Sequence, residues 1–305
     1  MRRCAVIGSP IAHSLSPLLH RTAYAELGIA DEFSYDAFEV TPDTLGDFIA
    51  GLGSEWVGLS VTAPNKQALL SYGEPDPIAA ALQSGNTIIF GAGDAPNRVF
   101  NTDVTGLLAA LARAGVGSAA TAMVIGNGAT ARSAFWALGR LGVRQAVVCA
   151  RSAERAHASL DDVAALAGIE FSVQSYGRPA ELPAGWGGRA DLLVSTVPVE
   201  LADDLAADLV AQARTVFEVV YTNYPSAFDR AARAAGVTSL DGLDLLVGQA
   251  IDQLKLMTGH DADPGPLLAA CRAEVLRKRL TGLLDGPDSA LDADANETTT
   301  TDRKA

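Results

Sequence analysis

Short segments in which apolar and polar residues alternate at every second position occur throughout the first hundred residues, and helical patterns separate them. The strand-like segments are residues 3–8, 33–40 and 56–63, and the helical patterns are residues 16–27 and 45–51. Strands that alternate with helices along a chain form mostly parallel sheets. We therefore predict an α/β unit with a mostly parallel sheet in the N-terminal part of the chain.

The next hydrophobic segments predict a hairpin and then a second alternating series. Residues 84–90 and 97–103 flank the turn-rich run GAGDAP, which is typical of an antiparallel hairpin at the edge of a sheet. The strongly apolar run at residues 104–115 predicts a helix that bridges two domains. From Thr121 a second α/β series begins, and its strand-like segments include residues 145–152, 170–176, 191–198 and 215–221.

This order of segments predicts two domains and a tail. Residues 1–104 form the first domain, and residues 105–237 form the second. The helical patterns within residues 238–283 are too long merely to cover the second sheet, so we expect them to pack back on the first domain and complete it. Residues 284–305 are polar and acidic with almost no large apolar residue, and we expect them to be disordered.

Composition excludes several classes of function. A chain of 305 residues with 49% hydrophobic residues can bury a substantial core, but its 36 acidic and 23 basic residues give a formal net charge of −13. Such a surface repels a phosphate backbone, so nucleic acid is not an expected partner. No apolar run reaches the ~20 residues of a membrane span, and the N-terminal segment lacks a signal-peptide core, so a cytoplasmic protein is expected. The three cysteines and four histidines have no metal-ligand or disulfide spacing.

A glycine-rich loop separates the first strand of the second series from its first helix. Gly126, Gly128 and Ala131 have the G-x-G-x-x-A spacing, in which glycines permit a tight turn and let a pyrophosphate approach the helix N-terminus. The same loop can be a purely structural turn. Its position between a strand and a helix favours a dinucleotide site.

The end of the next strand indicates which dinucleotide binds. Where a ribose 2′-hydroxyl normally meets an acidic residue, the chain has Ala150, Arg151 and Ser152, with Arg155 soon after. Ser152 can cap the following helix, and arginines at a helix start conflict with its dipole unless an anion is present. Solvated surface arginines are the alternative. We favour a 2′-phosphate site, hence NADP(H), with Arg151 as the main contact.

Short polar side chains gather in four segments of the first domain. These segments supply Ser14 and Ser16, Thr62 and Lys66, Asn86, and Asp103. Structural alternatives exist: Ser14 and Ser16 can be caps, Asn86 can be a turn residue, and Asp103 can be the N-cap of the bridging helix. Together they supply hydroxyl, ammonium, amide and carboxylate groups without a metal or an aromatic cage, which suits a small polyhydroxylated acid.

Lys66 has an unusual place in the segment GLSVTAPNKQALL. Pro64 ends a strand, and Asn65 is expected to cap a helix that holds Lys66 in its first turn. A positive charge at that end opposes the helix dipole. A lysine that served only solubility would be better placed at the other end, so a functional role is indicated.

In order and spacing, these segments resemble the shikimate dehydrogenase family. The matching motifs run from about residue 6 to residue 259 and read GSPIAHSLSP, SVTAPNK, GNT, NTDVTG, GNGATA, ARS, EVVY and DGLDLLVGQA. The resemblance implies an N-terminal α/β substrate-binding domain, completed by C-terminal helices, and a Rossmann-type NADP-binding domain. It also implies the reversible NADPH-dependent reduction of 3-dehydroshikimate to shikimate, a step in the synthesis of aromatic amino-acid precursors.

The resemblance further implies roles for individual positions. Lys66 and Asp103 would form the catalytic pair, which supplies a proton while hydride moves between nicotinamide C4 and the carbinol carbon. Ser14 and Ser16 would hold the substrate carboxylate. The other substrate-binding positions would be Thr62, Asn86, Tyr221 and Gln249, and the cofactor-binding positions would be Gly126, Gly128, Ala129, Arg151, Ser152, Arg155 and Gly242.

Several positions depart from the usual sequence of the family, among them Asn127 and Ala129 in the glycine-rich loop and the segment STVPVE, which lacks the GM that commonly follows the proline. Ser60 stands where asparagine is more common, which shortens one polar group near the ring. Ala150 replaces an asparagine beside the adenosine, Glu218 replaces an aspartate, and Leu245 replaces a methionine that packs on the cofactor. These departures leave the predicted fold unchanged and bear on cofactor affinity and preference.

Two other functions stay open. The first is quinate dehydrogenation on the same fold, but quinate use tends to accompany smaller groups at Ser16 and Thr62, and neither is reduced here. The second is a non-catalytic NADP-binding regulatory module, which loss of Lys66 or Asp103 would favour, and both residues are present. The sequence is compatible with a monomer and with a homodimer.

Overall fold

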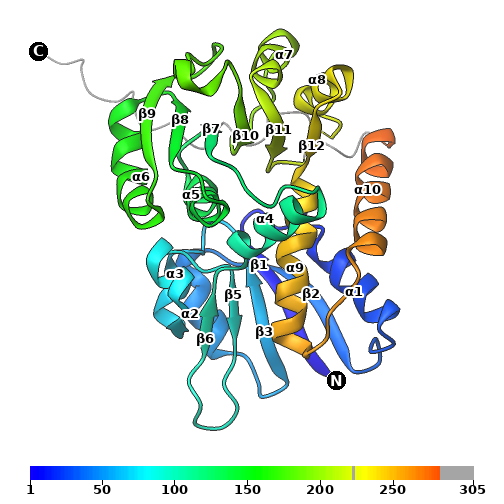
Figure 1. Ribbon diagram of the computed structural model, residues 1–305. Coiled ribbons are helices and arrows are strands. Elements are labelled where there is room, and N and C mark those ends of the chain that lie inside the picture. The colour runs from blue at the N-terminus through cyan, green and yellow to red at the C-terminus, as the bar shows by residue number, and fades with distance from the viewer. Residues whose placement is uncertain (222–223, 282–305) are drawn as a thin grey trace, which may run out of the picture.

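The computed structural model describes residues 1–221 and 224–281, and in this part of the chain helices cover two six-stranded sheets (Figure 1). The predicted α/β fold with mostly parallel sheets is confirmed. The predicted disordered tail, residues 284–305, lies outside the described residues.

The first sheet has the strand order β2-β1-β3-β5-β6-β4. Its strands are β1 (Arg2–Gly8), β2 (Phe33–Glu39), β3 (Trp56–Val61), β4 (Glu74–Pro75), β5 (Thr87–Ile89) and β6 (Arg98–Phe100). The helices of this part are α1 (Ser16–Glu26), α2 (Pro42–Ala50), the 3₁₀ helix η1 (Ala68–Tyr72) and α3 (Pro77–Leu82). Strand β1 pairs in parallel with β2 and β3, whereas β5 is antiparallel to both β3 and β6. The predicted hairpin is confirmed, with the short β4 beyond it at the edge.

The second sheet has the strand order β12-β11-β10-β7-β8-β9, and all its strand pairs are parallel. Its strands are β7 (Thr121–Ile125), β8 (Gln145–Ala150), β9 (Glu170–Ser175), β10 (Ala190–Ser195), β11 (Ala213–Glu218) and β12 (Thr238–Leu240). Its helices are α5 (Ala129–Leu141), α6 (Ala153–Ala167), the 3₁₀ helix η2 (Ala184–Trp186), α7 (Asp203–Ala211) and α8 (Ala227–Ala235). The strand order reverses between β7 and β10, and ligands of such sheets bind at that point.

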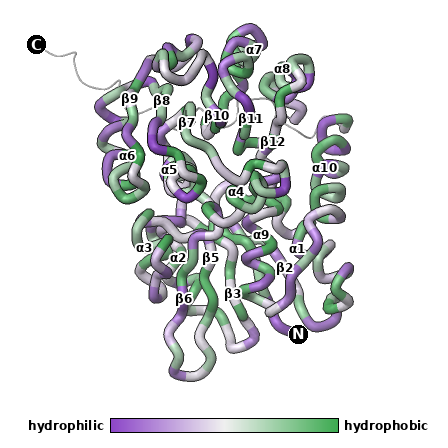
Figure 2. The backbone as a smooth tube through the Cα atoms, viewed as in Figure 1, coloured by the Kyte–Doolittle hydropathy of each residue, from purple (hydrophilic) through white to green (hydrophobic). Residues whose placement is uncertain are grey.

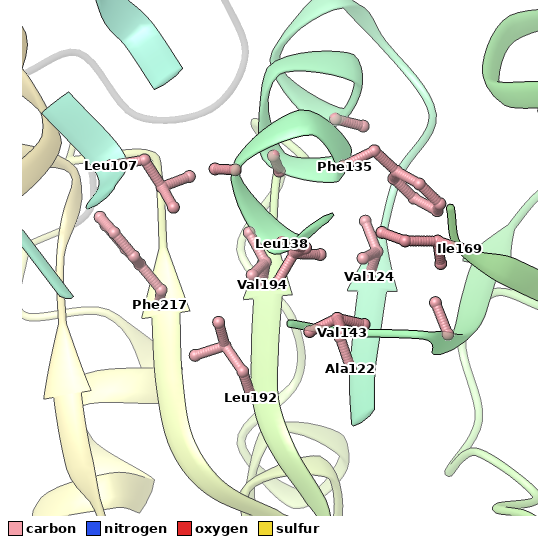
Figure 3. Packing of buried hydrophobic residues seen from close by; sticks show 14 of the residues in the cluster. Leu107, Ala122, Val124, Phe135, Leu138, Val143, Ile169, Leu192, Val194 and Phe217 are labelled. Atoms are coloured by element: carbon pink, nitrogen blue, oxygen red, sulfur yellow. The ribbon is translucent and has the colours of Figure 1, made fainter. Parts of the chain in front are cut away.

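Apolar side chains pack between the second sheet and the helices that cover it. Val124, Val194 and Phe217 extend from three neighbouring strands toward Leu138 of α5 and Leu107 of α4 (Figure 3). Hydrophobic residues follow the strands, and hydrophilic residues lie on turns of outer helices such as α6 and α8 (Figure 2). In the described part of the chain, no helix combines the length and apolarity needed to cross a membrane.

Three further helices complete the described part of the chain. Helix α4 (Thr102–Arg113) leads from the first sheet to the second, and α9 (Gly242–Thr258) and α10 (Pro264–Leu280) follow the second sheet. Apolar residues of α9 and α10, among them Leu254 and Cys271, are buried in one cluster with residues of β1, β2 and α1. The two C-terminal helices therefore pack against the first sheet and its helix α1 (Figure 1).

Candidate active site

One cavity brings together the residues that were predicted to bind the substrate or to act in catalysis. It has a volume of about 480 Å³, and its wall includes Ser14, Ser16, Thr62, Lys66, Asn86, Asp103, Tyr221, Gly242 and Gln249. The second sheet and its helices contribute Thr130, Thr196, Pro198 and Val219. Since Thr62 follows β3 and Thr196 follows β10, carboxyl ends of strands from both sheets face the cavity.

Lys66 and Asp103 form an ion pair on this wall. Lys66 Nζ lies 2.6 Å from Asp103 Oδ2, and Asp103 is only 8% exposed. Asp103 belongs to the first turn of α4, whose N-cap is Asn101, and the Asn101 side chain accepts a hydrogen bond from the backbone N–H of Asp103. The alternative of Asp103 as the N-cap is wrong, because Asn101 takes that place and leaves the carboxylate of Asp103 free to face the cavity.

The turn that carries Lys66 differs from the expected helix start. Residues 63–67 form turns, and only the 3₁₀ helix η1 follows. The side chain of Asn65 is buried and donates to the carbonyl oxygen of Val40 at 2.7 Å, so it does not cap a helix. The backbone carbonyl of Lys66 accepts from Gly85 N–H at 2.9 Å. The expectation of a helix capped by Asn65 is wrong, so a helix dipole does not explain the position of Lys66. The ion pair with Asp103 explains it instead.

Asn86 holds the second oxygen of the Asp103 carboxylate. Its Nδ2 donates to Asp103 Oδ1 at 2.9 Å and to Gln249 Oε1 at 3.1 Å. Its Oδ1 accepts from the backbone N–H of Thr102 at 2.8 Å. A backbone N–H can only donate, so this contact fixes which end of the Asn86 amide faces Asp103.

Two serines lie at the start of α1. The backbone N–H of Ser16 donates to Ser14 Oγ at 3.3 Å, and Ser16 is 5% exposed. The N-cap residue of α1 is Leu15, whose side chain cannot accept a hydrogen bond. A helix N-terminus with two hydroxyl groups beside it is suited to bind a carboxylate.

Some residues of the wall were not predicted from the sequence. Ser60, which was expected near the substrate ring although its role was left open, lines the cavity. Gln253, which was not singled out, also lines it and bonds to Ser60. Gln253 lies one helical turn after Gln249 on α9, so the spacing of the two glutamines was a usable signal. His13 also lines the cavity and is exposed.

A second cavity of about 380 Å³ lies at the switch point of the second sheet and shares Thr196 and Pro198 with the first. Gly126 has a φ of +100°, and a Cβ at this position would lie 2.5 Å from Thr196 Oγ1. Gly128 is the N-cap of α5, where no side chain among the described residues caps the helix, and a Cβ there would meet no atom within 4 Å. The open N–H groups of this turn fit a pyrophosphate.

One arginine belongs to the wall of this second cavity. Arg151 and Tyr176 line it, and Ser152 caps α6 by accepting from the Arg155 N–H at 3.2 Å. Among the described residues, no carboxylate lies within 4.0 Å of the Arg151 or Arg155 guanidinium. Ala129 and Arg155 lie in the first turns of α5 and α6 and are not part of the lining. Tyr176 was not predicted, although it follows the carboxyl end of β9.

Two acidic groups lie in or beside the first cavity, the partly buried Tyr221 in its wall and the buried Glu218. Burial raises the pKa of Glu218, the last residue of β11, to about 7. Burial also raises the pKa of Tyr221 to about 12, so this phenol stays protonated at neutral pH. Tyr221 therefore supplies no negative charge to the substrate cavity at neutral pH, and Glu218 does not line that cavity. Asp103 is the carboxylate that faces Lys66.

Comparison with known proteins yields a consistent set of relatives. Residues 6–88 match the family model described as shikimate dehydrogenase substrate binding domain. The shikimate dehydrogenase (NADP(+)) of Halobacterium salinarum is 37% identical over 277 residues, which cover 88% of this chain and 98% of that protein. The corresponding protein of Methanothermobacter thermautotrophicus is 31% identical over 264 residues, 84% of this chain and 90% of that protein.

Solved structures agree with these relatives. The shikimate dehydrogenase of Mycobacterium tuberculosis is 33% identical and has a TM-score of 0.78. The match covers 90% of this chain and 100% of the Mycobacterium chain. The shikimate 5-dehydrogenase of Thermus thermophilus, in complex with NADP(H) and shikimate, is 28% identical with a TM-score of 0.73. That match covers 90% of this chain and 99% of the Thermus chain.

Proposed function

Because the chain belongs to the shikimate dehydrogenase family, we propose that it catalyses the reversible reduction of 3-dehydroshikimate to shikimate with NADPH. The observation that carries the proposal is the Lys66–Asp103 ion pair of 2.6 Å in a cavity that adjoins the cavity of the glycine-rich loop. Identity of 37% over nearly the whole length supports it further.

Lys66 is the proposed proton donor for the reaction. NADPH, when bound, supplies the hydride for the carbonyl carbon of the substrate. The oxygen then gains negative charge, and the Lys66 ammonium donates a proton to it. Asp103 holds this ammonium in place through Oδ2, while Asn86 holds Oδ1. In the direction of oxidation, Lys66 accepts the proton of the alcohol.

The remaining residues of the first cavity are proposed to orient the substrate. Ser14 and Ser16 bind its carboxylate, helped by the N-terminus of α1. Thr62, Asn86 and Gln249 bind its hydroxyl groups, and Tyr221, as a protonated phenol, is a further donor.

The residues of the second cavity are proposed to bind NADP(H). Gly126 and Gly128 admit the pyrophosphate to the start of α5, with Ala129 and Ser152 in the adjacent turns. Arg151 binds the 2′-phosphate, and Arg155 adds positive charge nearby. Gly242 is proposed to lie beside the nicotinamide. A Cβ at Gly242 would lie 2.6 Å from the carbonyl oxygen of Val219, so the start of α9 is held against the end of β11.

Residues 1–104 with 238–283 are proposed as the substrate-binding domain, and residues 105–237 as the NADP-binding domain. The burial of Leu254 and Cys271 with residues of β1, β2 and α1 supports this division. A cytoplasmic location and a monomeric or homodimeric state stay predictions from the sequence.

Steady-state rates with shikimate and quinate, each with NADP and NAD, test the proposal. We expect the highest kcat/KM for shikimate with NADP. A higher value for quinate would favour the alternative substrate. NADP binding without turnover of either acid would favour a regulatory module.

A further inference from the structure

A buried chain of hydrogen bonds ends beneath the substrate cavity. Tyr35 OH lies 2.6 Å from Ser60 Oγ, and Ser60 Oγ lies 2.7 Å from Gln253 Oε1. Gln253 Nε2 lies 3.2 Å from the backbone oxygen of Asn86 and 3.0 Å from Thr87 Oγ1. Tyr35, Ser60 and Gln253 are at most 3% exposed, and Ser60 and Gln253 line the cavity.

Elementary donor and acceptor chemistry fixes the direction of this chain. A backbone carbonyl can only accept, so the amide nitrogen of Gln253 must face Asn86 and its oxygen must face Ser60. The Ser60 hydroxyl therefore donates its one proton to Gln253. Since that proton is used, Tyr35 must donate to Ser60.

Ser60 consequently has one remaining capacity, the second lone pair of Oγ. It can accept one further hydrogen bond and can donate none. An asparagine at this position would present both a donor and an acceptor. The ring of Tyr35 is held in place by His20, which stacks on it with a centroid distance of 3.9 Å and an interplanar angle of 7°.

We propose that Gln253 is a positioning residue that holds Ser60 as a hydrogen-bond acceptor for a hydroxyl group of the substrate. The inference rests on the proposed function, because it concerns how a ring hydroxyl is bound. A substrate hydroxyl has the required O–H, whereas a carbonyl or carboxylate oxygen would meet only another lone pair at this point. Gln253 thus favours an alcohol over a carbonyl at the place that Ser60 contacts.

The catalytic side of the cavity does not depend on Gln253. The orientation of Asn86 is already fixed by the backbone N–H of Thr102, and its backbone oxygen also accepts from the Val61 N–H at 2.8 Å. Removal of the Gln253 amide therefore releases the Ser60 proton but leaves the contact between Asn86 and Asp103 intact. Substitution of Gln253 by a residue that cannot accept this proton should therefore raise the KM for shikimate and leave kcat nearly unchanged.

A double-mutant cycle tests the inference. Gln253→Met preserves side-chain length and burial but cannot accept the Ser60 proton. We expect it to raise the KM for shikimate roughly three- to tenfold, a change that corresponds to the free energy of one hydrogen bond. Ser60→Ala should have a similar effect, with kcat within about threefold of wild type in both. Since Gln253→Met is expected to act on the substrate only through Ser60, the KM of the double variant should not exceed that of Ser60→Ala.

Two further variants separate this role from general support of the core. Leu254→Val perturbs the packing of α9 next to Gln253, and it should lower Tm without raising KM. Burial favours the neutral acid in Gln253→Glu, which presents a carbonyl oxygen to Ser60 and its O–H to the Asn86 carbonyl oxygen. This variant should retain a KM near that of wild type, which keeps the test valid should the methionine variant fail to fold. An unchanged KM in Gln253→Met, additive effects in the cycle, or a raised KM in Gln253→Glu would overturn the inference. Absence of wild-type turnover of shikimate in the same assay would instead contradict the proposed function.

Discussion

Gly106 of α4 and Gly248 of α9 cross so closely that neither position has room for a side chain. A Cβ at Gly248 would lie 2.4 Å from the Gly106 carbonyl oxygen, and a Cβ at Gly106 would lie 2.4 Å from the Gln249 backbone nitrogen. Asp103 lies one turn before Gly106 on α4, and Gln249 directly follows Gly248 on α9. The crossing therefore sets the separation between the proposed catalytic carboxylate and a proposed substrate-binding amide.

Gly248→Ala is expected to separate the two helices. The added methyl group meets backbone, which cannot move aside as a flexible side chain can, so we expect a loss of about 1–3 kcal/mol in the free energy of unfolding and a raised KM for shikimate. Gly117→Ala is a matched control, because a Cβ at Gly117 would meet no atom within 4 Å. Urea unfolding and steady-state kinetics of both variants check the prediction. Equal behaviour of the two would show that α9 can shift without cost.

Lys66→Ala is expected to lower kcat by a factor on the order of 10² to 10⁴ and to leave the KM for shikimate nearly unchanged. The lysine is proposed to donate the proton to the developing alkoxide, while the hydroxyl and serine contacts provide most of the binding. Lys255→Ala serves as the control, since Lys255 pairs with Asp261 on the surface at 2.9 Å, with 59% of its side chain exposed. Unchanged turnover of Lys66→Ala would remove Lys66 from the chemistry.

Arg151→Ala is expected to lower kcat/KM for NADP by roughly 10- to 100-fold and to leave the value for NAD nearly unchanged, because a charge-assisted hydrogen bond to the 2′-phosphate is lost. Arg155→Ala should have a smaller effect, because Arg151 lines the second cavity and Arg155 does not. Initial rates with both cofactors measure this. An equal loss for NADP and NAD would place Arg151 outside the 2′-phosphate site.

Glu218 is expected to make stability depend on pH. Burial raises the pKa of this carboxyl group from 4.5 to about 7, so between these values the unfolded chain has lost a proton that the folded protein retains. Stability therefore falls as pH rises from about 4.5 to about 7, by up to about 3 kcal/mol from this one group.

Glu218→Gln cannot ionise and should remove that part of the decrease. The free energy of unfolding of wild type and variant, measured in urea at pH 5, 6, 7 and 8, should diverge as pH rises, with the variant gaining relative stability. Glu170→Gln at an exposed position is the control. A constant difference between wild type and Glu218→Gln over this range would contradict the prediction.

Local patterns in the sequence determined the order of strands and helices, because alternation, turn residues and glycine spacing act over a few neighbouring positions. The hairpin of β5 and β6, the loop of Gly126 and Gly128 and the cap of α6 by Ser152 follow from such patterns. The motif spacing also singled out Lys66 and Asp103, which the tertiary structure brings to 2.6 Å.

Only the tertiary structure decided how these groups are held. Asn65 was expected to cap a helix, but the distant carbonyl of Val40 takes its amide, and η1 begins only at Ala68. The proposed role of Gln253 depends on its hydrogen bond with Ser60, which lies 193 positions earlier in the chain. The direction of a hydrogen bond depends on which donors and acceptors the fold brings within about 3 Å, and no local pattern contains that information.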